Sequence, residues 1–192
     1  MFTLVILISG RGSNMQAILE SLPRLPHVRV AAVISNRPDA AGLNTAQNAH
    51  IPTQVVDHTH YTARDDFDQA LQQRIDEWQP NLVVLAGFMR ILSREFVQHY
   101  AQRLINIHPS LLPAYKGLNT HQRVLDAGES RHGASVHFVT PELDDGPVIL
   151  QAEVPVYSDD TAKNLAQRVL VEEHRLYPQA IRQLAARHKA SS

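Results

Sequence analysis

Two polar side chains two residues apart, Asn106 and His108, are the pair in this 192-residue chain most suited to chemistry. They follow the apolar residues 104–105, which predict the end of a buried strand, and they precede Pro109. Alternate side chains of a strand share a face, so both groups should point into one space. An amide can donate to an oxygen that gains negative charge, and an imidazole exchanges protons near neutral pH. The pair suits acyl transfer; a polar turn in which both side chains satisfy backbone groups is the alternative.

The stretch Asn-Ile-His-Pro-Ser-Leu-Leu-Pro, residues 106–113, also predicts where this pair lies in the fold. Pro109 and Pro113 have no N–H, so neither continues a central strand. The chain should therefore leave the sheet here, at the carboxyl end of a strand. Open α/β sheets bind their ligands at this edge.

A second candidate site is the hexapeptide Ser-Gly-Arg-Gly-Ser-Asn at residues 9–14, between an apolar run at 3–8 and a helical pattern at 15–20. A glycine loop that leads into a helix N-terminus offers free N–H groups and the positive end of the helix dipole, which suits an anion. The loop lacks the Gly-Lys-Ser/Thr of a Walker A motif, and Met15 stands where a dinucleotide fingerprint has its third glycine. A phosphate monoester therefore fits better than NAD. The alternative is a tight turn with Ser13 or Asn14 as the N-cap.

The remaining patterns predict an α/β fold of the doubly wound kind, with a mostly parallel sheet and helices on both faces. Helices are expected at 40–49, 63–78, 94–100 with Ser93 as cap, 121–127 and 161–176, and strands at 30–34, 53–56, 82–86, 134–139 and 148–156. A polar tail follows the last helix, which Pro178 interrupts. We expect one domain over 1–192, with a phosphate-binding half at about 1–100 and a catalytic half at about 101–192.

Composition excludes several classes of function. A formal net charge of −1 argues against a general nucleic-acid binder, and the absence of cysteine excludes disulfides and thiolate chemistry. No stretch predicts a membrane span or a signal peptide, so a cytoplasmic protein is expected. His58 and His60 form the only close histidine pair, which predicts a solvated loop because no carboxylates complete a metal site around it.

Four motifs together resemble the phosphoribosylglycinamide formyltransferase family, folate-dependent enzymes of purine biosynthesis. They are the hexapeptide at 9–14, Ala-Gly-Phe-Met-Arg-Ile-Leu at 86–92, the octapeptide at 106–113 and Glu-Leu-Asp-Asp-Gly-Pro at 142–147. The third motif and the Asp-Asp-Gly-Pro piece mark the wider formyltransferase superfamily, and the first two make the resemblance specific.

The resemblance implies a role for each matching position. It makes Asn106, His108 and Asp144 catalytic, and it places the ribonucleotide at Gly12, Ser13, Asn14, Met15, Gln16 and Glu173. It places the folate at Arg64, Met89, Arg90, Ile91, Leu92, Asn106, Thr140, Pro141, Glu142, Leu143 and Asp144. Position 119 is Asn where some members carry His, so the resemblance implies no imidazole there.

The implied reaction is transfer of the formyl group of 10-formyltetrahydrofolate to the amine of glycinamide ribonucleotide. It needs two small-molecule substrates and no metal, nucleic acid or membrane, and a monomer or a homodimer could perform it. Two alternatives stay open at this point. One is another enzyme that uses formyltetrahydrofolate, such as a deformylase or a different amine formyltransferase, and the other is a non-catalytic nucleotide-binding module.

Overall fold

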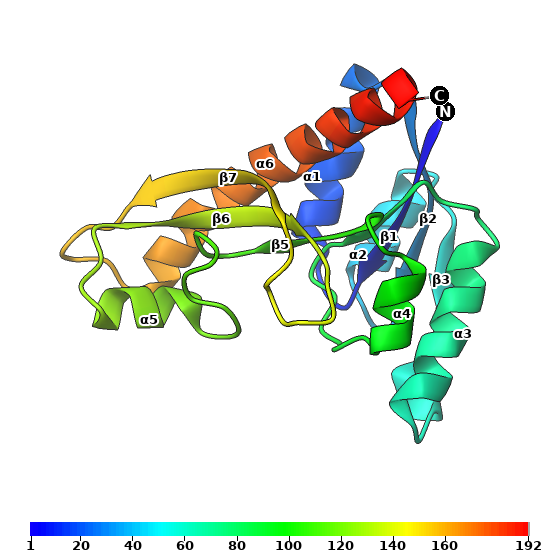
Figure 1. Cartoon of the computed structure of the whole chain (residues 1–192), viewed down its shortest axis with the longest axis horizontal. Helices are drawn as coiled ribbons and strands as arrows, with labels where there is room; N and C mark the ends of the chain where they lie inside the picture. The colour runs from blue at the N-terminus through cyan, green and yellow to red at the C-terminus, as the bar shows by residue number, and fades with distance from the viewer. Residues whose placement is uncertain (192) are drawn as a thin grey trace.

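The computed structural model describes residues 1–191 and contains one seven-stranded sheet within them, covered by helices on both faces (Figure 1). The strands are β1 Phe2–Ile8, β2 Val28–Ser35, β3 Thr53–Val55, β4 Leu82–Leu85, β5 Leu104–His108, β6 Arg131–Phe138 and β7 Val148–Pro155. The helices are α1 Ser13–Ser21, α2 Gly42–Asn48, α3 Arg64–Asp76, α4 Arg94–His99, α5 Thr120–Asp126 and α6 Ala162–Ser191, with short 3₁₀ turns at Leu22–Arg24 and His58–His60. The predicted α/β fold class is confirmed.

The strand order is β3-β2-β1-β4-β5-β6-β7. The first five strands in that order are parallel, β6 is antiparallel to β5, and β7 is antiparallel to β6. The chain builds outward from β1 through β2 and β3, and then crosses back to β4 and β5. The order therefore reverses between β1 and β4, and the carboxyl ends of these two strands form the edge where such sheets bind ligands.

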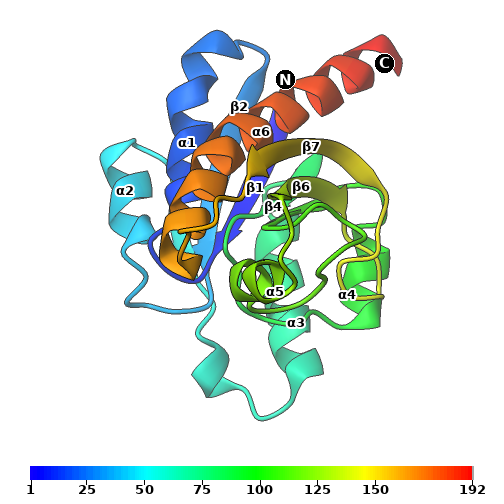
Figure 2. The ribbon, with the colours of Figure 1, turned by 90° about the vertical axis from the view of Figure 1, so that its left-hand side faces the viewer.

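Alternating side chains of β1 divide the core into two layers. Leu4, Ile6 and Ile8 join the cluster formed with α1, α2 and α6, whereas Val5 and Leu7 join the cluster formed with α3 and α4. All five side chains are fully buried. Figures 1 and 2 show the same division, with α1 and α6 side by side on one face of the sheet and α3 and α4 on the other. The continuous apolar run thus produces a strand buried on both faces, as predicted.

The C-terminal helix is longer than the sequence predicts. Instead of ending before Pro178, α6 continues through it to Ser191. A proline inside a helix removes one hydrogen bond and crowds the preceding turn. Here the flanking residues Tyr177, Ala180 and Ile181 are completely buried against the sheet. The apolar contacts of this face outweigh the lost bond, and a local breaker signal cannot report them.

The prediction of a solvated loop at residues 58–60 is wrong for His58. This residue opens the 3₁₀ turn after β3, and its Nδ1 donates to the backbone carbonyl of Asn36, at 2.8 Å. His58 thereby ties the carboxyl ends of β2 and β3 together. Among the described residues, no helix is long and apolar enough to cross a bilayer.

Candidate active site

Strand β5 carries Asn106 and His108 and extends three residues beyond the apolar residues 104–105. The Asn106 position pairs with His137 of antiparallel β6, and the His108 position pairs with Ser135. Both side chains project from the same face of the strand because they are two residues apart. The chain leaves the sheet at Pro109, as predicted from the two prolines.

His108 faces the carboxylate of Asp144. The distance from His108 Nδ1 to Asp144 Oδ2 is 3.4 Å, and the two side chains are only 8% and 9% exposed. His108 Nε2 donates to the backbone carbonyl of Tyr115, at 2.9 Å, since a carbonyl oxygen can only accept. This bond fixes the plane of the imidazole and leaves Nδ1 directed toward the carboxylate. Residues 36 positions apart in the sequence thus form one polar pair.

The loop that carries Asp144 is held in place at several points. Asp144 Oδ2 accepts from the backbone N–H of Gly117, at 2.9 Å, and the neighbouring Asp145 forms an ion pair with Lys116. Two residues later, a Cβ on Gly146 would lie 1.8 Å from the carbonyl oxygen of Phe138, so only glycine fits there. Asp144 itself has a φ of 49°, in the left-handed region, which Asp tolerates better than most residues. The carboxylate is therefore presented to His108 by a tightly constrained turn.

The amide of Asn106 differs from these groups because it has no hydrogen-bond partner within residues 1–191. The side chain is half-buried beside the His108–Asp144 pair. An amide of this kind can donate to a ligand oxygen without first breaking a protein bond. The alternative in which Asn106 satisfies a turn of the backbone has no support in its contacts.

Helix α1 begins at Ser13, two residues before the predicted start, and its N-cap is Gly12 with a φ of 70°. No side chain caps the helix, so the alternative with Ser13 or Asn14 as the N-cap is wrong. The N–H groups of the first turn have no acceptor within a helix. Gly12 lies close to Met15 and Gly42, where a Cβ would be 3.2 Å and 3.4 Å from the nearest atoms. The loop thus offers its backbone donors to an anion.

Glu173 of α6 lies beside this loop, 159 residues away in the sequence. The Asn14 amide donates to Glu173 Oε2, at 2.8 Å. Burial raises the pKa of Glu173, and the bond from Asn14 opposes that rise. The implied ribonucleotide site is thereby assembled from two helices. Met15 contributes only its backbone, because its side chain is completely buried, and the exposed Gln16 bonds to Glu20.

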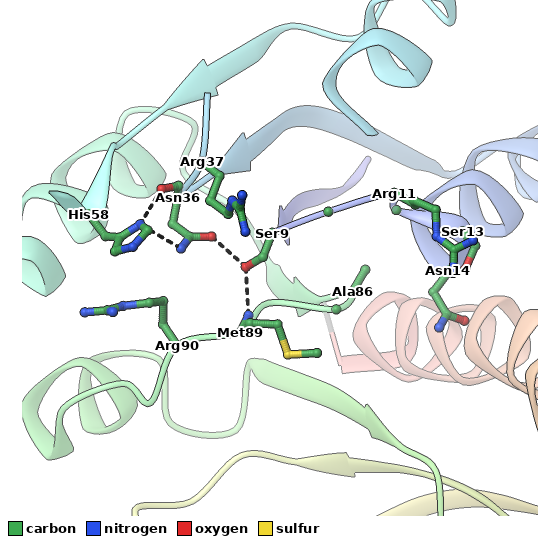
Figure 3. Close-up of a pocket in the computed structure, with 13 residues that line it drawn as sticks. Ser9, Arg11, Ser13, Asn14, Asn36, Arg37, His58, Ala86, Met89 and Arg90 are labelled. Carbon is green, nitrogen blue, oxygen red and sulfur yellow. Dashed lines mark hydrogen bonds between the residues drawn. The ribbon is translucent and has the colours of Figure 1, made fainter. Parts of the chain in front are cut away.

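A cavity of about 560 Å³ joins the glycine loop to the segment after β4 (Figure 3). Ser9 Oγ donates to Asn36 Oδ1, at 2.6 Å, and accepts from the N–H of Met89, at 2.7 Å. Arg90 and His58 line the same cavity. The sequence motifs predict no role for Ser9, Asn36 or His58. The sequence could have indicated Asn36 and His58, because they follow the predicted strands β2 and β3. The carboxyl ends of parallel strands lie at one edge of a sheet, so these two side chains are expected there.

The implied folate segments are unusually apolar for exposed loops. Met89, Ile91 and Leu143 are 76%, 68% and 63% exposed. Exposed apolar side chains on loops beside a polar site are typical of a ligand-binding surface. Arg94, the first residue of α4, lies 3.6 Å from Glu142 and connects the helix that follows the Met89–Ile91 loop to the loop that carries Leu143.

The other implied folate residues are arranged around these loops. Arg90 lies over the ring of Phe67 on α3, 5.4 Å from its centre, and Arg64 is exposed at the start of the same helix. Leu92 packs against the α3–α4 core. Thr140 and Pro141 lie in the loop after β6, where Thr140 Oγ1 donates to the carbonyl of Glu142, at 3.3 Å.

The family model named formyl transferase matches residues 2–181. The chain belongs to the formyl transferase family. It is 51% identical over 180 residues to the phosphoribosylglycinamide formyltransferase of Escherichia coli (strain K12), covering 93% of this chain and 84% of that protein. It is 45% identical over 183 residues to the trifunctional purine biosynthetic protein adenosine-3 of Homo sapiens, covering 94% of this chain and 18% of that protein.

Solved structures of formyltransferases also match this chain over most of its length. The phosphoribosylglycinamide formyltransferase of Coxiella burnetii matches with a TM-score of 0.92 at 51% identity, covering 96% of this chain and 87% of that one. Glycinamide ribonucleotide transformylase 1 of Symbiobacterium toebii matches with a TM-score of 0.93 at 45% identity, covering 97% and 88%. The resemblance drawn from the four sequence motifs is confirmed.

Proposed function

We propose that this chain transfers the formyl group of 10-formyltetrahydrofolate to the amine of glycinamide ribonucleotide, which yields formylglycinamide ribonucleotide and tetrahydrofolate. The observation that carries the proposal is the grouping of the Asn106 amide, which has no partner within residues 1–191, with the His108–Asp144 pair at the carboxyl edge of the sheet. The relatives named phosphoribosylglycinamide formyltransferase support the choice of substrates.

The phosphate of the ribonucleotide binds at the first turn of α1. The free N–H groups at Ser13, Asn14 and Met15 and the dipole of the helix favour a dianion there. Glu173 accepts hydrogen bonds from the ribose hydroxyls, since the Asn14 amide already directs its carboxyl toward the loop. The amine then extends toward β5.

The folate binds across the two apolar loops. Its ring system covers the exposed side chains of Met89, Ile91 and Leu143, and its carboxylates extend toward exposed Arg64 and toward Arg90, which lines the cavity. Burying apolar surface on both partners contributes about 25 cal/mol per Å² removed from water. The ring then lies between the Met89–Leu92 segment and the Thr140–Asp144 turn, next to Asn106.

The reaction joins these two sites. The amine nitrogen attacks the formyl carbon, and the negative charge that develops on the formyl oxygen is stabilised by the Asn106 amide and by protonated His108. In that form Nε2–H stays bound to the Tyr115 carbonyl and Nδ1–H is directed toward the oxygen. The separation of 3.4 Å between Nδ1 and Asp144 exceeds that of a strong charge-assisted hydrogen bond, so an oxygen can compete for this proton. Asp144 accepts the proton that the amine loses, and the folate nitrogen gains a proton as its bond to carbon breaks. Holding both substrates in contact supplies much of the rate.

Catalysis requires no metal in this scheme. The described residues contain no group of three or more His, Cys, Asp and Glu side chains that could hold a metal ion. The cytoplasmic location and the monomeric or homodimeric state stay predictions from the sequence.

The test is a formyl-transfer assay with the purified chain, which follows tetrahydrofolate release with and without glycinamide ribonucleotide. The proposal predicts release that depends on the ribonucleotide and matches the formylated product one to one. Release without the ribonucleotide, accompanied by formate, would identify a deformylase instead. The absence of release with either mixture would leave only a binding protein.

A further inference from the structure

His137 is a buried imidazole at the proposed site that the reaction described above does not use. It lies on β6, directly opposite Asn106 in the β5–β6 register, and is 2% exposed. Side chains of directly paired residues on neighbouring strands share one side of the sheet. His137 Nε2 lies 3.7 Å from Asp144 Oδ1, whereas His108 approaches the other carboxylate oxygen, Oδ2. Asp144 is therefore placed between two imidazoles.

The contacts of His137 fix which ring nitrogen carries hydrogen. Nδ1 lies 2.9 Å from the backbone carbonyl of Phe138, and a carbonyl oxygen can only accept, so Nδ1 donates. Burial lowers the pKa of His137, more than the neighbouring Asp144 raises it, and the ring is neutral near pH 7. Its Nε2 then bears a lone pair. This nitrogen is buried and has no hydrogen-bond partner in the described part of the chain.

Two acceptors thus face each other across 3.7 Å, the Nε2 lone pair and Asp144 Oδ1. Neither can donate while Asp144 is ionised, and a buried acceptor without a donor is unfavourable. The arrangement changes when Asp144 takes up a proton. An Oδ1–H group can donate to Nε2 after a shift of less than about 1 Å, since O–H···N bonds form near 2.8 Å.

We propose that His137 is a positioning residue for proton transfer, because its Nε2 accepts a hydrogen bond from Asp144 during the interval in which Asp144 carries the proton. The inference rests on the proposed formyl transfer. As the bond between the amine nitrogen and the formyl carbon forms, that nitrogen releases a proton to Asp144 Oδ1. As the bond between carbon and the folate nitrogen breaks, Asp144 returns the proton to that nitrogen. The carboxylate is restored, and no proton is gained or lost overall.

The test compares kcat and both KM values in variants of His137. His137→Phe keeps a planar ring but has no acceptor, and we expect kcat to fall about tenfold or more with little change in either KM. His137→Gln places an amide oxygen near the position of Nε2 and should recover part of that loss. His137→Asn has the same amide on a shorter side chain, does not reach Asp144, and should stay as slow as His137→Phe.

The matched control is His132→Phe, the same replacement at another buried position of β6. His132 pairs with His121, with 3.0 Å between His132 Nε2 and His121 Nδ1, and has no contact with Asp144. Its kcat should change by less than about threefold, as expected where no transition-state contact is lost. Melting temperatures measured on all four variants identify any that fail to fold.

Each outcome decides the inference. A folded His137→Phe enzyme with the kcat of the wild type would overturn it, as would equal losses in His132→Phe. If His137→Phe does not fold, the kcat of His137→Gln is compared with that of His137→Asn. Equal kcat values for these two variants would also overturn the role of His137. A wild-type chain that transfers no formyl group would refute the proposed function itself, whereas an active wild type with equally active variants would refute only this inference.

Discussion

Glu173 is a buried carboxyl whose hydrogen bond within residues 1–191 comes from the Asn14 amide alone. Its folded-state pKa is raised above the ordinary value of 4.5, mainly because burial disfavours the charged form. A carboxyl with a raised folded pKa binds more protons in the folded state than in the unfolded one. Stability therefore falls as pH rises from about 4.5 through the raised folded-state pKa, and stays lower above it.

Glu173→Gln tests both parts of the role proposed for this residue. The amide still accepts from Asn14 but carries no charge, so the variant should melt at a higher temperature than the wild type at pH 7–8. This gain in melting temperature should disappear below about pH 4.5, where the Glu173 carboxyl of the wild type is protonated and, like the glutamine amide, neutral. The KM for glycinamide ribonucleotide should rise about tenfold or more, since a hydrogen bond to a charged group contributes about 1.5–3 kcal/mol. A KM that changes only for the folate would contradict the assignment of Glu173 to the ribose.

At the scale of elements, the entry into α1 depends on the left-handed backbone of Gly12. Gly12→Ala should lower stability by about 1–2 kcal/mol, the cost of this conformation for an L-residue with a side chain. It should also raise the KM for the ribonucleotide. The new Cβ would lie 3.2 Å from Met15 Cε, and relieving this close contact would displace residues 9–14, the loop proposed to bind the phosphate. Chemical denaturation and steady-state kinetics measure the two effects.

Gly128→Ala is the control for this prediction. Gly128 has nearly the same φ, 67°, but a Cβ there would meet no atom within 4 Å. Both variants should lose similar stability, and only Gly12→Ala should change the KM. If the two variants have the same KM for the ribonucleotide, the phosphate does not bind at the loop of residues 9–14.

Tyr177 connects helix α6 to the carboxyl edge of the sheet. Its hydroxyl donates to the carbonyls of Leu85 and Ile105, at 2.7 Å and 3.2 Å, and these residues close β4 and directly precede Asn106 in β5. Tyr177→Phe leaves both carbonyls without this donor in a buried position, so unfolding should become easier by about 1–3 kcal/mol. A Tm equal to that of the wild type would show that packing alone holds the helix there.

At the scale of the whole molecule, the sequence was informative where one local pattern decides the structure. The apolar run at residues 3–8 predicted a strand buried on both faces, and Ser93 caps α4 through the N–H of Phe96, as predicted. The motif at 106–113 predicted the strand end and the shared face of Asn106 and His108. These features depend on neighbours in the sequence.

Features that depend on distant partners could not be predicted in the same way. Helix α6 continues through Pro178 because a buried face outweighs a local breaker. His58 and His137 gained their positions from strand pairing, which brings together residues that are 22 and 31 positions from their partners Asn36 and Asn106. Asp144 was placed by resemblance, and the reason that it meets His108 lies in a turn held by Gly117.

The two loops implied in folate binding give a prediction for the molecule as a whole. A bound folate analogue should slow amide exchange at Met89–Leu92 and Thr140–Asp144, while residues 10–14 should change less. In the proposed arrangement, Met89–Leu92 and Thr140–Asp144 cover the folate ring system, and residues 10–14 bind the phosphate of the ribonucleotide. Protection confined to residues 10–14 would reverse the assignment of the two sites.

The central claim is that His108, together with Asn106 and Asp144, performs the chemical step. It is tested most directly by the kcat of His108→Ala, measured beside its melting temperature. The account predicts a folded enzyme whose kcat falls by about a hundredfold or more, since removing one oxyanion donor has this effect in comparable sites. His27→Ala, an exposed histidine in the turn before β2, should keep the kcat of the wild type. A folded His108→Ala enzyme that works at nearly the wild-type rate would contradict the account.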